Sequence, residues 1–214
     1  MRKRNKRVIP GFGLSMGVTI AMLSCVVLIP LATLVIYSSS LGIRQFFEVI
    51  TKPRVLSSFY VSILTAFVAT VINTVMGLIL AWVLVRYKFP GKRIMDGMIE
   101  IPFALPTAVA GISLTSLTSD TGVLGSFFGH FGIKIAYTRL GIIVALIFVG
   151  IPFVVRAVQP VLEKLDGSYE EAARVMGAKR SVIFWRVVFP ELKPALFAGA
   201  GLAFGRCLGE YGSV

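Results

Sequence analysis

The stretch YEEAARVMGAKRSVIFWRVVFP, residues 169–190, is polar and charged but lies between segments that are strongly apolar. Its pattern predicts two short amphipathic helices joined at Gly177, because glycine readily takes the left-handed conformation that ends a helix. Ser168 and Glu171 have the spacing of a capping box, which predicts the start of the first helix. We therefore expect a helix pair on an aqueous face of a membrane protein.

Each of the two predicted helices has one apolar face. In the first helix, Glu170, Glu171 and Arg174 are expected to point mostly away from that face. The faces consist of Tyr169, Ala172, Ala173 and Met176 in the first helix and of Ile183, Phe184, Val187 and Val188 in the second. Such a helix pair is suited to docking in the groove of a partner protein. The alternative is a helix pair that lies on the lipid surface.

The order of residues in this stretch resembles the EAA loop, the signature of the permeases of ATP-binding-cassette (ABC) importers. The residues that carry the resemblance are Glu171, Ala172, Ala173, Gly177, Val187 and Pro190. The family prefers Ile and Leu where this chain has Val187 and Phe189, and these changes leave the apolar face intact. The resemblance implies that this EAA loop, assigned to residues 160–193, is cytoplasmic, binds an ATPase subunit and transmits its movement.

The composition is that of an integral membrane protein, with 56% hydrophobic and 15% charged residues among 214. The formal net charge of +12 does not indicate a nucleic-acid-binding protein, because the basic residues gather in short clusters at the ends of apolar runs. Cys25 and Cys207 both lie in apolar runs, so neither a disulfide framework nor a metal site is expected.

Five apolar runs are candidates to cross a bilayer, whose hydrocarbon core is about 30 Å thick. The predicted spans are residues 14–37, 59–85, 95–117, 140–158 and 194–214, and residues 1–13 form a basic amino-terminal segment. The first run is too long for the apolar core of a cleavable signal peptide, so we expect it to be retained. The predicted fold class is an all-α integral membrane protein with residues 14–214 as one transmembrane domain.

Basic clusters set the predicted orientation of these spans. Residues 1–7 carry five Lys and Arg side chains, and a second cluster without an acid follows the second span at Arg86, Lys88, Lys92 and Arg93. Under the positive-inside rule, both clusters mark the cytoplasmic side. The amino terminus is therefore expected in the cytoplasm.

Two further phrases of the sequence resemble one family of importer permeases. Residues 101–111, IPFALPTAVAG, resemble the corresponding segment of sulfate/thiosulfate importer permeases, and Pro102 and Pro106 within them are expected to bend the third span. Residues 206–214, RCLGEYGSV, resemble the same family in its last matching helix. The resemblance covers nearly the whole chain, which is similar to the T-type subunit of two related permeases.

This resemblance implies a type I (MetI-like) importer permease fold inside a larger complex in the inner (plasma) membrane of a bacterial cell. The implied partners are ABC ATPase subunits, a second related permease, an extracytoplasmic sulfate-binding protein and the lipid bilayer. ATP and Mg²⁺ would bind to the ATPase subunits, so no cofactor is expected in this chain.

The sequence contains no motif of a catalyst. We find no phosphate-binding G-x-x-x-x-G-K-[ST] loop, no nucleophile elbow and no cluster with metal-ligand spacing. No catalytic or metal-ligating residue is therefore assigned, and the energy for transport is expected to come from separate ATPase chains.

Arg206 and Glu210 are an exception to the apolar fifth span, since ionisable groups at that depth are costly and usually functional. They lie one turn apart and are expected to pair. Glycines at 201, 205, 209 and 212 surround them and would allow another helix to approach closely. Two interpretations remain open, a structural ion pair and a role in the translocation pathway or its gate.

The predicted function is that of a permease subunit of an ATP-driven sulfate/thiosulfate importer working by alternating access. The alternatives are an importer of molybdate or tungstate, an ion-driven transporter or channel, and a membrane scaffold. An ion-driven transporter would be expected to carry buried acids along several spans and to lack the EAA loop. The fifth span stops in a Gly-rich phrase at Val214, so we also expect the chain to be a truncated or partial product.

Overall fold

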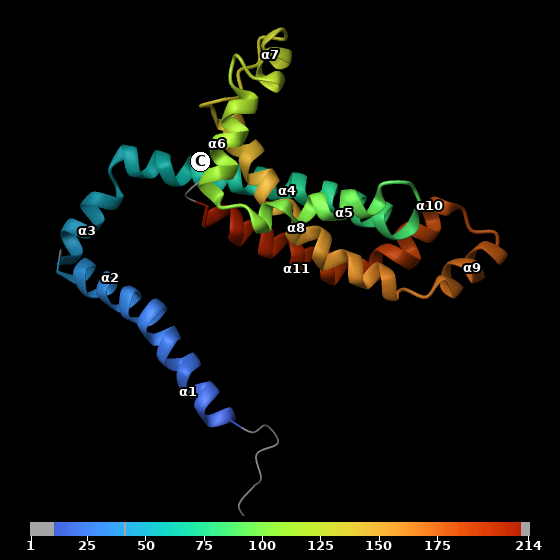
Figure 1. Cartoon of the computed structure of the whole chain (residues 1–214), viewed down its shortest axis with the longest axis horizontal. Helices are drawn as coiled ribbons and strands as arrows, with labels where there is room; N and C mark the ends of the chain where they lie inside the picture. The colour runs from blue at the N-terminus through green and yellow to red at the C-terminus, as the bar shows by residue number, and fades with distance from the viewer. Residues whose placement is uncertain (1–10, 41, 211–214) are drawn as a thin grey trace, which may run out of the picture. The chain divides into compact units, whose positions relative to one another are not determined.

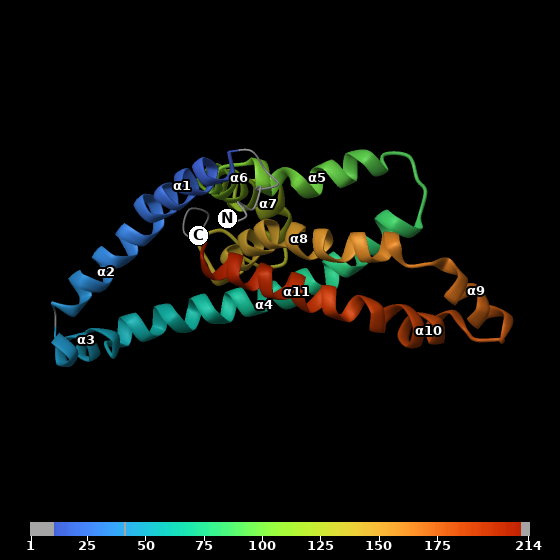
Figure 2. The same ribbon diagram turned by 90° about the horizontal axis from the view of Figure 1, so that it is seen from below.

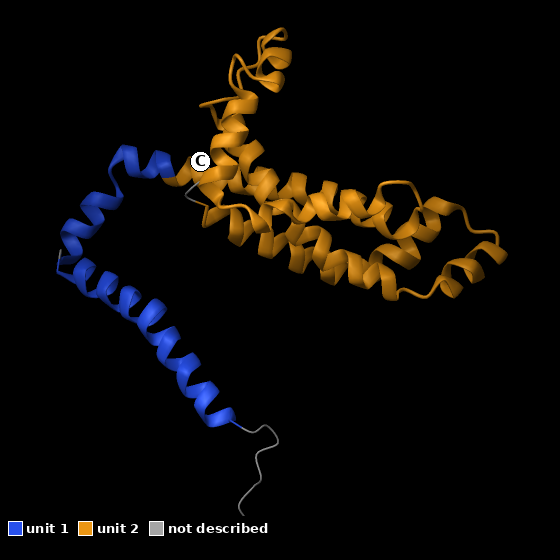
Figure 3. Ribbon diagram, in the orientation of Figure 1, with its two compact units in different colours: residues 1–58 blue, residues 59–214 orange. Residues whose placement is uncertain are grey.

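The computed structural model describes residues 11–40 and 42–210, and every regular element in these ranges is a helix (Figure 1). The chain divides into two units, residues 1–58 and 59–214 (Figure 3). Helix α4 (Pro53–Arg86) runs through the boundary between them. The predicted all-α membrane fold is confirmed, since the described residues include four helices that are long and apolar enough to cross a membrane, and a bent helix pair makes a fifth candidate.

The first unit is built on one apolar helical run from Phe12 to Ser39, which contains the predicted span 14–37. The run consists of α1 (Phe12–Leu23), a π-helical turn η1 (Ser24–Leu28) and α2 (Ile29–Ser39), and α3 (Gly42–Ile50) follows it. None of the residues of α1, η1 or α2 is buried within the chain. The basic residues 1–10 lie outside the described part of the chain.

The second unit holds most of α4 and the elements that follow it. These are α5 (Lys92–Ala104), α6 (Thr107–Thr118), α7 (Val123–Gly129), α8 (Arg139–Lys164), α9 (Gly167–Val175), α10 (Arg180–Ile183), η2 (Phe184–Val188) and α11 (Phe189–Leu208). Helices α8 and α11 lie side by side in both views (Figures 1 and 2). Their buried side chains form the main core together with Ala81 and Leu84 of α4 and Ile99 of α5.

Small residues allow the three long helices to come close. A Cβ atom at Gly199 of α11 would lie 2.9 Å from the Cβ of Ala157, and one at Gly77 of α4 would lie 2.7 Å from the Cβ of Val154. At Gly201 and Gly205 an added Cβ would meet nothing within 4 Å. Gly77 and Gly199 therefore allow the long helices to come close, whereas Gly201 and Gly205 of the predicted glycine face meet no other helix within the described residues.

The predicted third span, residues 95–117, is two helices instead of one. Helices α5 and α6 meet at an angle of 116°. The break lies at Leu105, whose extended backbone (φ −86°, ψ 136°) is the conformation that a following proline favours, here Pro106. The predicted bend is thus confirmed at Pro106, whereas Pro102 lies inside α5.

The helices at the EAA loop extend beyond the spans that we predicted. Helix α8 passes through Pro152 and Pro160 to Lys164, and one continuous helix runs from Arg180 through Pro194 to Leu208. The predicted loop limits, 160 and 193, therefore fall inside helices. A proline inside a helix costs about 3 kcal/mol, and the buried neighbours of these prolines, such as Leu162 and Leu192, offset that cost by packing in the core.

Each of the two π-helical turns ends two residues before a proline, at Leu28 before Pro30 and at Val188 before Pro190. Proline has no N–H to donate to the carbonyl four residues back, so the hydrogen-bond ladder must change there. A widened turn is one way to make that change. The second helix of the EAA loop, α10 with η2, is called the second arm of the loop. It thereby continues into the last spanning helix, α11, without a break.

Candidate functional site

The first arm of the EAA loop is α9, and its N-cap is Asp166 instead of the predicted Ser168. The Asp166 carboxylate accepts a hydrogen bond of 3.0 Å from the backbone N–H of Ser168. This bond lowers the pKa of Asp166 below its usual value. The predicted capping box of Ser168 and Glu171 is wrong because aspartate is an equally good N-cap and stands two residues earlier.

The turn between the two arms is the one that the sequence predicts. Gly177 has φ +80°, which confirms the left-handed conformation. Its N–H donates to the carbonyl of Arg174 at 2.9 Å, and the N–H of Ala178 donates to the carbonyl of Ala173 at 3.0 Å. These two bonds define a Schellman motif, which fixes the direction in which the chain leaves α9.

The two arms differ in how they present their apolar faces. In the second arm, Ile183 and Val188 are buried within the chain, and Val188 belongs to the main core, so this part of the predicted docking face is covered by the chain itself. In the first arm only Ala173 is buried, whereas Tyr169 is 64% and Met176 is 80% exposed. Glu171 and Ala172 are exposed beside them. The first arm therefore presents an apolar surface that no described residue of this chain covers.

The remaining predicted residues of the EAA loop belong to the second arm. Val187 is half-buried in η2, and Pro190 is exposed at the start of α11. Both lie where the loop joins the spanning helix. The second arm also exposes apolar side chains, since Trp185 is 60% exposed.

An ion pair that the sequence did not predict attaches α9 to α4. Glu170 pairs with Arg86, and their side chains are 13% and 25% exposed. Glu170 was expected to point away from the apolar face, but it is turned inward because Arg86 lies at the end of α4. Both residues lie on the predicted cytoplasmic side with opposite charges, which is the signal that was available in the sequence.

A second unpredicted network joins α8 to α5. Arg156 Nη1 lies 2.9 Å from Asp96 Oδ1, and Arg156 Nη2 lies 2.8 Å from Glu100 Oε1. Arg156 also donates to Gln159 Oε1 at 2.7 Å. The three residues come from sequence positions far apart, with Asp96 and Glu100 in α5 and Arg156 in α8. The structure makes them one network that holds α5 against α8.

Arg206 and Glu210 form the predicted ion pair. Arg206 Nη1 lies 2.6 Å from Glu210 Oε2, and the Glu210 side chain is 1% exposed whereas that of Arg206 is 29% exposed. Glu210 lies just beyond the end of α11, whose C-cap is Gly209. Gly212 and the rest of the final phrase lie outside the described residues.

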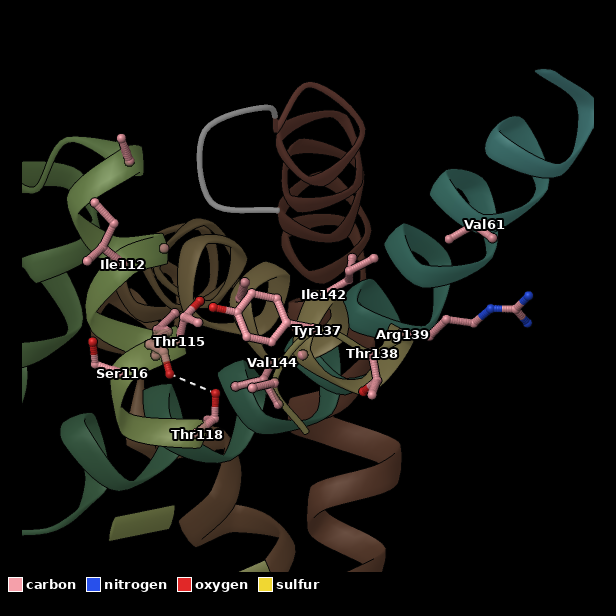
Figure 4. Close-up of a pocket in the computed structure, with 16 residues that line it drawn as sticks. Val61, Ile112, Thr115, Ser116, Thr118, Tyr137, Thr138, Arg139, Ile142 and Val144 are labelled. Atoms are coloured by element: carbon pink, nitrogen blue, oxygen red, sulfur yellow. Dashed lines mark hydrogen bonds between the residues drawn. The ribbon is translucent and has the colours of Figure 1, made fainter. Parts of the chain in front are cut away.

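A pocket of about 900 Å³ lies between α6 and the start of α8 and contains none of the predicted site residues (Figure 4). Its polar lining includes the hydroxyl groups of Thr115, Ser116 and Thr118. The guanidinium of Arg139 points away from these hydroxyls (Figure 4). Arg139 is nevertheless the one charged residue among the described residues that line this pocket. Across the described ranges, no three His, Cys, Asp or Glu side chains are grouped so that they could hold a metal ion.

The chain is similar to known transport proteins. Residues 73–214 match the family model described as "Binding-protein-dependent transport system inner membrane component". The sulfate transport system permease proteins CysT of Salmonella typhimurium and Escherichia coli are each 50% identical over 210 residues, which is 98% of this chain and 76% of each relative. The protein of the same name from Synechocystis is 49% identical over 197 residues, covering 92% of this chain and 69% of the relative.

Proposed function

Because this chain belongs to the family of binding-protein-dependent transport system inner membrane components, we propose that it is the permease subunit of an ATP-driven sulfate importer. The observation that carries this proposal is the exposed apolar surface of α9, formed by Tyr169 and Met176 beside Glu171. A surface of this kind on the cytoplasmic side is suited to insertion into a groove of an ATPase subunit. The names of the similar proteins favour sulfate over molybdate or tungstate.

The proposed complex contains chains besides this one. A second related permease completes the pathway, ATPase subunits bind ATP and Mg²⁺, and a binding protein delivers sulfate on the outer side. The permease spans the inner membrane of a bacterial cell with its amino terminus in the cytoplasm and carries out no catalysis by itself. When the ATPases close and open, they move both arms of the EAA loop. The membrane-spanning helices respond by opening the pathway to one side of the membrane and then to the other.

We propose that Arg206 and Glu210 act as a structural ion pair at the end of α11. Glu210 is almost fully buried, which suits a residue that fixes a helix end better than one that lines an open pathway. Arg206 is more exposed and neutralises the carboxylate from one turn away. A role in the pathway predicts instead that exchanging the two residues restores no uptake.

Uptake of labelled sulfate tests the proposed substrate. The chain is produced in cells that lack their own sulfate permease but retain the other subunits. We expect uptake that depends on this chain and ceases when cellular ATP is depleted, and we expect unlabelled thiosulfate to reduce it. Cells without the chain are the control. Uptake of labelled molybdate in place of sulfate would contradict the proposal.

A further inference from the structure

Helix α9 has few attachments to the helices that cross the membrane. Ala173 is its only buried residue, and within the described part of the chain its one ion pair is that between Glu170 and Arg86. The turns at both ends of α9, at Asp166 and Gly177, are exposed. A short helix held in this way would pivot when a partner pushes on it, unless a specific contact resists the motion.

Arg86 is itself held in place at the end of α4. Its guanidinium carbon lies 5.5 Å from the centre of the Trp82 ring, within the range of a cation–π interaction. The Trp82 ring contacts Phe184 edge to face, with 5.2 Å between centroids and an angle of 81° between planes. Phe184 begins the π-helical turn η2 of the second arm. The last turns of α4 therefore touch both arms of the EAA loop.

We propose that Arg86 and Glu170 are positioning residues that transmit movement of the EAA loop to α4. This inference rests on the proposed function, in which an ATPase subunit moves the loop. The exposed surface of α9 receives the ATPase, and the inward Glu170 passes its displacement to Arg86. Trp82 and Phe184 connect the same end of α4 to the second arm, so the loop and α4 move together.

The position of the pair favours a role in transmission over a role in docking. The Glu170 side chain is 13% exposed, so little of it is available to a partner, whereas its neighbour Glu171 is exposed. An ion pair that is partly removed from water is screened less than a surface pair. It can therefore oppose the separation of α9 from α4 throughout the transport cycle.

The test uses the assembled complex in proteoliposomes and measures sulfate transported per ATP hydrolysed. In Glu170→Gln and in Arg86→Gln, we expect the ATPase to co-purify as in the wild type and ATP hydrolysis to continue. We expect the transport-to-hydrolysis ratio to fall about fivefold, the lower end of typical coupling between sites. The exchange Arg86→Glu with Glu170→Arg should restore most of the ratio. Lys88→Gln, which removes an exposed charge two residues from Arg86, is the matched control and should keep the wild-type ratio.

Three results would overturn the inference. In the first, transport and ATP hydrolysis fall together, so that the transport-to-hydrolysis ratio stays at the wild-type value, as expected if the ion pair is merely structural. The exchange could give no rescue, or Glu170→Gln could lose the ATPase, which would make Glu170 a docking residue. Failure of the wild-type chain to retain the ATPase would instead contradict the proposed function, so the two failures are distinguishable.

Discussion

Replacing Gly177 with valine is expected to abolish sulfate uptake while leaving the chain in the membrane. Gly177 has φ +80° and no neighbouring atom within 4 Å of an added Cβ, so the effect arises in the backbone alone. A left-handed conformation costs an L-residue about 1–2 kcal/mol, and a β-branched residue adopts it least readily. Helix α9 has little packing to oppose this strain, so the Schellman motif should open and the two arms should lose their relative direction.

The measurement compares labelled-sulfate uptake with the amount of chain in the membrane fraction. Gly167→Val is the matched control, since Gly167 is equally uncrowded but has no positive φ. Asparagine tolerates the left-handed conformation better than valine, so Gly177→Asn should retain part of the uptake. Wild-type uptake by Gly177→Val would show that the turn geometry is unimportant for coupling.

Removing Arg206 is the second change with a large expected effect. Arg206→Ala takes away a cation 2.6 Å from a carboxylate that is almost fully buried, so we expect loss of uptake and a less stable chain. Glu210→Ala should have a similar effect. Because the two residues contact each other directly, their interaction in a double-mutant cycle is expected to be about 1–3 kcal/mol.

The exchange of the two residues separates the structural role from a role in the pathway. For a structural pair, Arg206→Glu combined with Glu210→Arg should recover much of the uptake and of the thermal stability in detergent. Full loss of uptake in the exchanged variant, with stability restored, would assign Arg206 to the pathway or its gate. Wild-type uptake by Arg206→Ala would remove both interpretations.

The sequence predicted those features of the site that depend on residues close together in the chain. Spacing within residues 169–190 predicted the turn at Gly177 and the apolar face of the second arm, because one residue type and one helical period determine each of them, but not that the chain itself buries part of that face. The same local pattern predicted the N-cap at Ser168. That prediction is wrong because Asp166, two residues earlier, is the N-cap and the helix begins at Gly167. Neighbouring caps of similar strength cannot be ranked by pattern alone.

Contacts between distant residues were beyond the reach of the sequence pattern. Arg86 and Glu170 are 84 positions apart, and Arg156 and Asp96 are 60 apart. Each of these residues has a plausible local explanation, in a basic cluster, on a polar helix face or at a helix end. The prolines within α8 and α11 show the same limit, since their effect on helix ends depends on buried neighbours that only the packed structure identifies.

The most direct measurement of the central claim, that the exposed face of α9 docks with an ATPase subunit, is site-specific photocrosslinking in the assembled complex. A photoreactive residue at Met176, which is 80% exposed, is compared with one at Val123 of α7, which is 76% exposed. Helix α9 lies at one end of the second unit, and α7 lies away from it beyond α6 (Figure 1). We predict a crosslink to the ATPase from Met176, its loss in Glu171→Arg, and none from Val123. A crosslink from Val123, or none from Met176 in a complex that transports sulfate, would contradict the claim.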